Sequence, residues 1–145
     1  MVREIAETEL EELLELYLHL HEGTVPEMTE HLKRAWNPIL QDENHHVIVN
    51  EVAGKIVSSC VCVVIPNLTM SVRPYALVEN VVTCPEHRGR GYGTECMNYA
   101  KKIAEEQGCY KIMLLTGAKD RPTLQFYGNA GYDSSDKTAF VQWLE

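Results

Sequence analysis

The stretch CPEHRGRGYGT, residues 84–94, interleaves two arginines with three alternate glycines in an otherwise acidic chain. Glycines in a turn let backbone N–H groups approach a ligand closely, and Arg88 and Arg90 add bidentate donors suited to phosphate oxygens. Valines precede the turn and an amphipathic pattern follows it, which predicts a strand leading into a helix. Because the N-terminus of a helix presents unpaired amides and a positive dipole end, the stretch predicts a diphosphate-binding site.

A nucleotide site or a purely structural role fits this turn less well. The spacing Gly89-x-Gly91-x-Gly93 is not the GxGxxG pattern of dinucleotide-binding folds, and no GxxxxGK[ST] pattern is present, so NAD and ATP sites are poor fits. Tight strand-to-helix geometry alone would need one or two glycines but no arginines. The formal net charge of −8 argues against a nucleic-acid partner, because such domains usually carry a basic face.

The segments around the turn predict a βαβ unit. Residues 75–83, YALVENVVT, are almost entirely apolar and predict a central strand, in which Glu79 and Asn80 are conspicuous. Shielding a carboxylate from water is costly unless it is paired, so we expect Glu79 to be partly buried and to have a role. An apolar helical face ending at Gly108 and a second apolar strand over 109–116 follow. The two strands should therefore be parallel neighbours.

The remaining elements are expected from periodicity and turn residues. They are helices over 8–22, where Thr8 and Glu11 form a capping-box pattern, and from Pro26 to Pro38 or slightly beyond; strands over 46–51 and 55–65 joined through Ala53-Gly54; a loop over 66–74; a helix over 121–129; and a C-terminal strand over 138–144. The 145 residues suffice for a single domain spanning 1–145.

Composition predicts a cytoplasmic protein without metal. No apolar run is long enough to cross a bilayer, and the N-terminus lacks a signal-peptide core, so no membrane association is expected. The five cysteines include no CxxC pair and predict reduced, mostly buried thiols, with a nucleophilic Cys84 as the alternative. His19, His21 and His31 form no ligand set at fixed spacing.

The turn and the segments around it resemble the GCN5-related N-acetyltransferase (GNAT) superfamily. RGRGYG is similar to the signature R/Q-x-x-G-x-G/A, and LQFYGNAGY, residues 124–132, is similar to the segment FYEKxGF. Helix pair, hairpin, turn, helix and strand also occur in the family's order over nearly the whole chain. The resemblance implies a mixed α/β fold with a twisted, mostly antiparallel sheet, helices on both faces and a parallel pair of strands splayed around acetyl-CoA.

The resemblance also implies which residues hold acetyl-CoA. Val81, Val82 and Thr83 would offer backbone groups to the pantetheine arm and the thioester. The pyrophosphate would lie on the turn, chiefly on its amides, through residues Arg88, Gly89, Arg90, Gly91, Tyr92, Gly93 and Thr94. Asp120 departs from the pattern, since many members have an asparagine there. A carboxylate accepts hydrogen bonds but donates one only when protonated, which puts its contact with the ligand in doubt.

Two side chains are implied to act in the reaction. Tyr127 matches the tyrosine that protonates the departing thiolate; the competing interpretation is a core aromatic packed beside Phe126. Glu79 would remove a proton from the acceptor amine, or would bind a cationic amine, or would form a structural pair with Arg73. The amide of Val81 is the expected donor to the oxyanion.

The resulting hypothesis is an acetyl-CoA-dependent N-acetyltransferase that acts on a primary amine of a small molecule or peptide by direct attack in a ternary complex. Glu22, Glu27 and Glu30 would favour a cationic acceptor, or would only form a charged face in contact with solvent. A glucosamine-6-phosphate-type acceptor would need cations, for which Lys33, Arg34 and Arg73 are the candidates. The alternative function is a catalytically silent acyl-CoA sensor. The C-terminal strand, with Phe140 and Trp143, could supply a homodimer edge or core packing.

Overall fold

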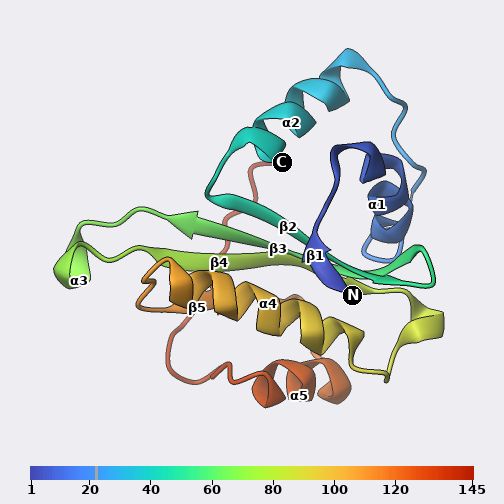
Figure 1. The fold of residues 1–145 in the computed structure, drawn as a ribbon. Helices are drawn as coiled ribbons and strands as arrows, with labels where there is room; N and C mark the ends of the chain where they lie inside the picture. Colours follow the sequence, from blue (N-terminus) through green and yellow to red (C-terminus); the bar gives the residue numbers. More distant parts are fainter. Residues whose placement is uncertain (22) are drawn as a thin grey trace.

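The computed structural model describes residues 1–21 and 23–145 and contains a five-stranded sheet in the order β1-β2-β3-β4-β5 (Figure 1). The strands are β1 (Val2–Glu4), β2 (His45–Val52), β3 (Lys55–Ile65), β4 (Tyr75–Thr83) and β5 (Ile112–Leu114). Neighbouring strands are antiparallel except β4 and β5, which are parallel. The predicted mixed sheet with one parallel pair is confirmed.

Helices cover both faces of this sheet, as predicted (Figure 1). They are the 3₁₀ turns η1 (Glu7–Glu9) and η2 (Pro85–His87), and the helices α1 (Leu10–Tyr17), α2 (Glu30–Gln41), α3 (Thr69–Val72), α4 (Tyr92–Glu106) and α5 (Arg121–Asn129). One buried cluster joins the sheet to α4, and a second joins it to α1 and α2. Within the described residues, no helix has both the length and the apolar character needed to span a membrane.

The first two helices begin later than their sequence patterns predict. The expected capping box of Thr8 and Glu11 is replaced by Glu9, whose carboxylate accepts a hydrogen bond from Ala6 N at 2.8 Å and pairs with Arg3. The predicted end at residue 22 is wrong, because α1 ends at Tyr17 and a turn follows over 18–20; residue 22 itself lies outside the described residues. α2 starts at Glu30 and not at Pro26, because Thr29 Oγ1 accepts from Leu32 N at 3.3 Å and so caps the helix.

Several strand predictions hold and others do not. The hairpin of β2 and β3 turns through Ala53 and Gly54, both with positive φ, and β4 has the predicted bounds. The predicted loop over 66–74 contains the single turn α3. β5 is shorter than the predicted 109–116, and β1 was not expected. The predicted C-terminal strand over 138–144 is wrong, because nothing in the described chain pairs with that segment.

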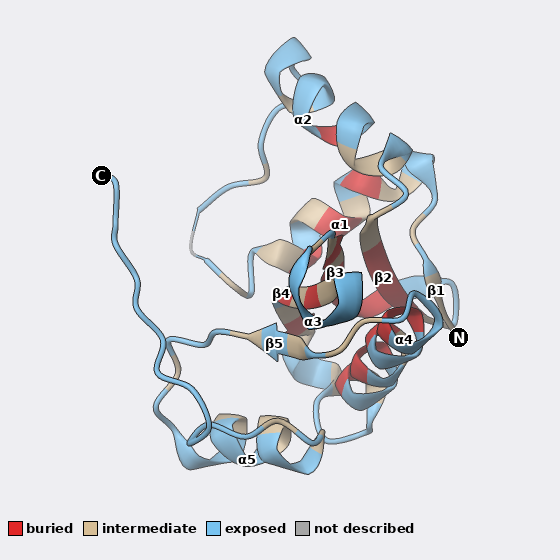
Figure 2. Cartoon of the chain, turned by 90° about the vertical axis from the view of Figure 1, so that its left-hand side faces the viewer, coloured by how far each residue is buried: buried red, intermediate tan, exposed pale blue. Residues whose placement is uncertain are grey.

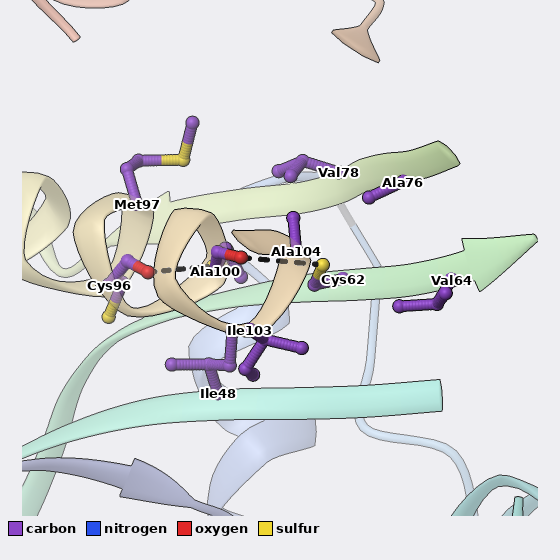
Figure 3. Packing of buried hydrophobic residues seen from close by; sticks show 11 residues of the cluster. Ile48, Cys62, Val64, Ala76, Val78, Cys96, Met97, Ala100, Ile103 and Ala104 are labelled. Carbon is purple, nitrogen blue, oxygen red and sulfur yellow. Dashed lines mark hydrogen bonds between the residues drawn. The ribbon is translucent and has the colours of Figure 1, made fainter. Parts of the chain in front are cut away.

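Three cysteines help to pack α4 onto the sheet. Cys60 Sγ donates to Cys96 O at 3.6 Å and Cys62 Sγ donates to Ala100 O at 3.9 Å (Figure 3). Their thiols and that of Cys96 are buried, as expected from the sequence. Because burial disfavours the thiolate, it raises the pKa of Cys62 to about 12. These thiols are therefore protonated packing groups.

Candidate active site

A bulge interrupts β4 at the centre of the sheet. Glu79 pairs with Val61 and Val82 pairs with Ser59, so three steps along β4 match two steps along β3. Asn80 lies in this bulge with φ 51°, a left-handed conformation that asparagine tolerates better than most residues. Side chains alternate between the two faces of a sheet along a strand. The extra residue in the bulge therefore moves each later side chain of β4 to the face opposite the one it would otherwise occupy.

The exchange is visible in the packing on the two faces. Before the bulge, Ala76 and Val78 belong to the buried cluster on the α4 side, and after it Val81 packs against that cluster. Val82 instead belongs to the cluster on the side of α1 and α2. The consecutive residues Val81 and Val82 therefore pack on opposite faces of the sheet.

The bulge also decides which backbone groups face β5. Cys84 N donates to Val57 O on β3 at 2.8 Å, so the preceding residue, Thr83, faces the opposite edge. There its carbonyl accepts a hydrogen bond from Arg88 Nε at 3.3 Å. Val81, two residues earlier, faces the same edge. The Val82 carbonyl accepts from Ser58 Oγ at 3.0 Å on the β3 side.

The two parallel strands part beside these groups. β5 pairs with β4 only from Ala76 to Val78, whereas β4 continues to Thr83. The edge of β4 that carries the backbone of Val81 and Thr83 therefore has no strand paired with it, and this unpaired stretch of edge is called the opening below. This geometry agrees with the splayed pair predicted from the sequence.

The glycine-rich turn ends beside this opening and presents unpaired amides. Gly89 has φ 75° and Gly91, the N-cap of α4, has φ 87°, so both need the conformational freedom of glycine. No side chain caps the helix. In the described chain, none of the N–H groups from Gly89 to Thr94 donates a hydrogen bond. These amides, together with the helix dipole, are suited to an anion, and that they bind a diphosphate remains a prediction.

Gly93 is needed for a different reason from the other two glycines. A Cβ atom there would lie 3.1 Å from Thr83 Oγ1 and 3.3 Å from Phe126 Cζ. The absence of a side chain lets the first turn of α4 rest against the end of β4 and against α5. Thr83 Oγ1 is also 2.8 Å from Ser58 Oγ, which fixes the end of the strand.

The two arginines of the turn are available for a ligand. Both side chains are exposed, and within the described residues neither forms an ion pair. Arg88 is steadied by its bond to Thr83 O, while Arg90 stands between the two glycines with positive φ. Two unpaired guanidinium groups beside a row of free amides suit a doubly charged anion.

Tyr127 lies on α5 with its ring partly buried. The ring is 5.2 Å from that of Phe126 and 6.4 Å from that of Tyr132, measured between centroids, and it packs against the α4-side cluster. It therefore fulfils the predicted packing role, from a position in the second turn of α5. Burial raises the pKa of its hydroxyl, and the carboxylate charge of Glu79 acts in the same direction. The hydroxyl stays protonated at neutral pH.

Glu79 is exposed, so the partial burial expected from the sequence is wrong. Glu79 directly precedes the bulge at Asn80, which is also exposed, so apolar neighbours do not shield this part of β4. The predicted alternative of a pair with Arg73 also fails, because Arg73 Nε donates to Met70 O and the guanidinium lies over the Tyr110 ring. Glu79 instead lines a cavity of about 360 Å³ between β4 and the first two helices.

This cavity is lined mainly by apolar side chains of α1 and α2, among them Leu13, Tyr17 and Trp36. Trp36 Nε1 donates to Glu7 O at 3.3 Å, which joins α2 to η1, the turn that precedes α1. Burial raises the pKa of Tyr17 to about 12, against a smaller opposing effect of the nearby Asn80 and Ser59 side chains. No lysine or arginine is among the described residues that line the cavity.

Asp120 caps the N-terminus of α5, which explains why a carboxylate is found at this position. It is the N-cap of α5, and its Oδ2 accepts from Thr123 N at 3.0 Å and from Thr123 Oγ1 at 2.7 Å. These hydrogen bonds lower the pKa of the carboxyl. Aspartate and asparagine are both strong capping residues, so aspartate in place of the family's asparagine preserves the N-cap of α5. A contact with acetyl-CoA remains a prediction.

Sequence reasoning missed the bulge and the cavity. A signal for the bulge was present, because asparagine in an apolar strand is one of the few residues that adopt positive φ readily. No local sequence pattern indicates the cavity, because the residues that line it come from two helices and three strands that are distant in the chain.

Comparison with known proteins matches this arrangement to one family. The family model described as the acetyltransferase (GNAT) family matches residues 10–132. A solved structure, a putative acetyltransferase from Agrobacterium tumefaciens, is 33% identical and covers 99% of both chains with a TM-score of 0.90. The similarity therefore extends over the turn, β4, α4 and α5.

Two curated relatives are similar in sequence. An uncharacterized N-acetyltransferase of Methanocaldococcus jannaschii is 27% identical over 150 residues, covering 99% of this chain and 64% of the relative. The glucosamine 6-phosphate N-acetyltransferase of Trypanosoma brucei brucei is 30% identical over 91 residues, covering 63% of this chain and 60% of the relative. The chain thus spans less than two thirds of the length of either relative.

Proposed function

Because the chain belongs to the acetyltransferase (GNAT) family, we propose that it transfers the acetyl group of acetyl-CoA to a primary amine of a small molecule or peptide. The observation that carries the proposal is the opening beside β4. It lies on β4 between Glu79, which lines the apolar cavity, and the glycine-rich turn, which follows the strand. Donor and acceptor can therefore meet in a ternary complex.

The donor would be held by the turn and by the edge of β4. The pyrophosphate of acetyl-CoA carries the charge that the free amides from Gly89 to Thr94 and the two unpaired arginines suit. GNAT acetyltransferases use acetyl-CoA, and the pantetheine arm would run along the backbone groups of Val81 and Thr83. Val82 would contribute less, because its carbonyl is already bonded on the β3 side.

Acetyl transfer requires attack of a neutral amine on the thioester carbonyl and protonation of the departing thiolate. Glu79, at the cavity, would attract the ammonium form of the acceptor and take its proton. Val81 N–H, on the edge of β4 that borders the opening, would stabilise the negative charge developing on the carbonyl oxygen. Tyr127, kept protonated by its surroundings, would supply the proton to sulfur.

The cavity narrows the acceptor class. Its wall is apolar, with Glu79 as the one carboxylate among the described lining residues, so an amine carried on an apolar body fits it best. Lys33 and Arg34, which a sugar phosphate would need, are exposed and do not line it, and Arg73 contacts Tyr110 instead. Glu27 and Glu30 are exposed and do not line the cavity, and Glu30 pairs with Lys33, whereas Glu22 lies outside the described residues.

We expect the full chain to consume acetyl-CoA with amines of this class. Thiol release and product mass would be followed with a panel of aryl-alkyl monoamines, polyamines, peptides with free amino groups and glucosamine 6-phosphate. Aryl-alkyl monoamines should give the highest kcat/KM, because they combine apolar burial with a single cation.

The panel separates the proposal from its rivals. Highest activity on glucosamine 6-phosphate would overturn the apolar acceptor class in favour of the activity of the trypanosomal relative. Saturable binding of acetyl-CoA without turnover on any amine would instead favour an acyl-CoA sensor. Thermal stabilisation by NAD or ATP but not by acetyl-CoA would contradict the donor assignment.

Replacing Glu79 with glutamine should lower kcat/KM about 10²-fold, because glutamine keeps the shape of the side chain but cannot take up a proton. The acidic limb of the pH–rate profile should also disappear. Glu43→Gln, an exposed glutamate in the loop before β2, is the matched control and should behave like the unmodified chain. A rise in KM for the amine with unchanged kcat and pH profile would show that Glu79 only attracts the cation.

A further inference from the structure

The sheet carries a row of polar side chains where the N-terminal end of α4 packs on it. Asn50 on β2 pairs with Ser58 on β3, and Ser58 pairs with Thr83 on β4. These three residues, called the polar row below, therefore lie side by side across three strands and on one face of the sheet. It is the face that α4 covers, and the buried residues of β2 and α4, red in Figure 2, lie next to each other there. The cluster that joins α4 to the sheet is otherwise apolar.

Asn50 hydrogen-bonds to the first turn of α4. The residue is 0% exposed, and its Nδ2 donates to Tyr92 O at 3.3 Å and to Glu95 Oε2 at 2.7 Å. Its Oδ1 accepts from the Met1 ammonium at 3.2 Å. Both amide protons and the amide oxygen are therefore used, as a buried asparagine requires. The contacts join a central part of the sheet to the end of α4 that follows the glycine-rich turn.

The other end of the polar row contacts the same turn of the helix. A Cβ atom at Gly93 would lie 3.1 Å from Thr83 Oγ1, so the helix backbone rests against this hydroxyl. Thr83 Oγ1 is in turn 2.8 Å from Ser58 Oγ. The first turn of α4 thus meets the sheet at two places, at Asn50 and at Thr83. The free amides over 89–94 belong to this turn and to the loop before it, so the polar row fixes where they lie relative to β4.

Glu95 brings a negative charge into the first turn of α4. A carboxylate there is attracted by free amides and by the positive end of the helix dipole, which are the groups that a phosphate would use. In the described chain, no amide from 89 to 94 donates to Glu95, whose Oε2 accepts from Asn50 instead. The hydrogen bond to Asn50 therefore holds this carboxylate toward β2.

We propose that Asn50 is a positioning residue for the phosphate site. It holds the first turn of α4 in place on the sheet, and it keeps the Glu95 carboxylate from the amides that the pyrophosphate of acetyl-CoA would bind. The inference rests on the proposed function, since it takes acetyl-CoA to be the ligand of the turn. It gives a part in donor binding to β2, a strand that contributes none of the residues proposed to touch the donor.

The substitution Asn50→Asp tests this role because it changes the shape little and the chemistry greatly. An ionised aspartate would still accept from the Met1 ammonium, but it could not donate to Tyr92 O or to Glu95. Two carboxylates within hydrogen-bond distance share one proton, and this raises the pKa of one of them. The two side chains would therefore repel each other at high pH and regain a hydrogen bond when they take up a proton at low pH.

We expect Asn50→Asp to weaken acetyl-CoA binding about 10-fold or more at about pH 8 and to bind nearly as well as the unmodified chain at about pH 5.5. Calorimetric titration of both proteins over this range gives the ratio of their dissociation constants. Adding Glu95→Gln should restore the affinity at about pH 8 to within about threefold, because the glutamine amide can donate to the new carboxylate. Unchanged affinity would overturn the proposal, as would a loss that is equal at every pH and remains with Glu95→Gln.

The matched control is Ser59→Ala. Ser59 is also 0% exposed and its Oγ donates to Ile48 O at 2.8 Å, but it pairs with Val82 and so faces α1 and α2. The variant loses one buried hydrogen bond on the opposite face and should bind acetyl-CoA like the unmodified chain. An equal loss of affinity in this variant would show that Asn50 has no special role. Thermal unfolding followed by circular dichroism would show that each variant is folded during the titration.

Hydrogen exchange separates this inference from the proposed function, because it needs no ligand. The hydrogen-bonded amides of α4 begin at Glu95, whose N–H donates to Gly91 O at 3.0 Å. Mass spectrometry of peptides over 95–100 should show faster exchange in Asn50→Asp than in the unmodified chain at about pH 8, reversed by adding Glu95→Gln. If the unmodified chain failed to bind acetyl-CoA, the proposed function would be wrong, yet this faster exchange would still establish that Asn50 positions the turn. Unchanged exchange would overturn the positioning role, whatever ligand the turn binds.

Discussion

Replacing Tyr127 with phenylalanine should lower kcat about 10²-fold or more while the affinity for acetyl-CoA stays nearly constant. The substitution removes one oxygen and keeps the ring that packs against Phe126 and Tyr132. The lost group is the proposed acid for the leaving thiolate, which acts during transfer and not during binding. Stopped-flow or steady-state thiol release would give kcat, and calorimetry would give the dissociation constant of acetyl-CoA.

The pH dependence adds a second measurement to this prediction. Burial raises the pKa of Tyr127 above the ordinary tyrosine value, which is about 10. An acid with a raised pKa keeps its proton to higher pH, so turnover should show no loss from this group below about pH 10. A fall in kcat at lower pH that disappears in Tyr127→Phe would contradict the raised pKa.

Tyr132→Phe is the matched control for this experiment. Its ring is the neighbour of Tyr127, it packs against the same cluster, and burial also raises the pKa of its hydroxyl. If Tyr127→Phe and Tyr132→Phe both left turnover unchanged, Tyr127 would have only the packing role and the general-acid assignment would be wrong. Equal losses in both variants would point to disturbed packing of α5.

The second large effect is expected for Gly91→Asp, which should weaken acetyl-CoA binding about 100-fold or more. The new carboxylate would occupy the space of a phosphate and would place a negative charge where the ligand's negative charge should bind. Gly91 is the N-cap of α4 with φ 87°, a conformation that aspartate and asparagine adopt more easily than other residues. An aspartate there would cap the helix with its own carboxylate. It would thus occupy amides that are free for the phosphates.

Gly91→Asn isolates the effect of charge in this experiment. Asparagine has the same shape, tolerates the same backbone conformation and also caps helices, but it is neutral. Calorimetric titration with acetyl-CoA should give a much smaller loss of affinity for asparagine than for aspartate, and the difference should shrink at high salt. Equal losses for the two variants would show that the turn acts through its shape and not through its electrostatics.

The sequence predicted those parts of the molecule whose causes are local. The turn at residues 84–94, β4 and α5 were correctly placed because glycine, proline and apolar periodicity act within a few residues. The boundaries of α1 and α2 were less accurate. There the helix start depends on which side chain reaches the free amides, as Glu9 and Thr29 do.

The features that the sequence did not predict depend on distant partners. The pattern over 138–144 showed that the segment could be a strand, but a strand exists only where another one pairs with it. Glu79 was expected to be shielded because its neighbours are apolar, and the bulge at Asn80 changed its surroundings. β1 has only three residues, too few for any periodic pattern to be recognised.

The residues proposed to hold the donor and those that line the acceptor cavity come from different elements on the two sides of β4. Donor contacts are proposed for the turn, α4 and the end of β4, while the acceptor cavity is walled largely by α1 and α2. The two sets of residues share little beyond β4 itself. A duplicated gene could therefore exchange residues of the first two helices and acquire a new acceptor, while its inherited donor chemistry remained intact.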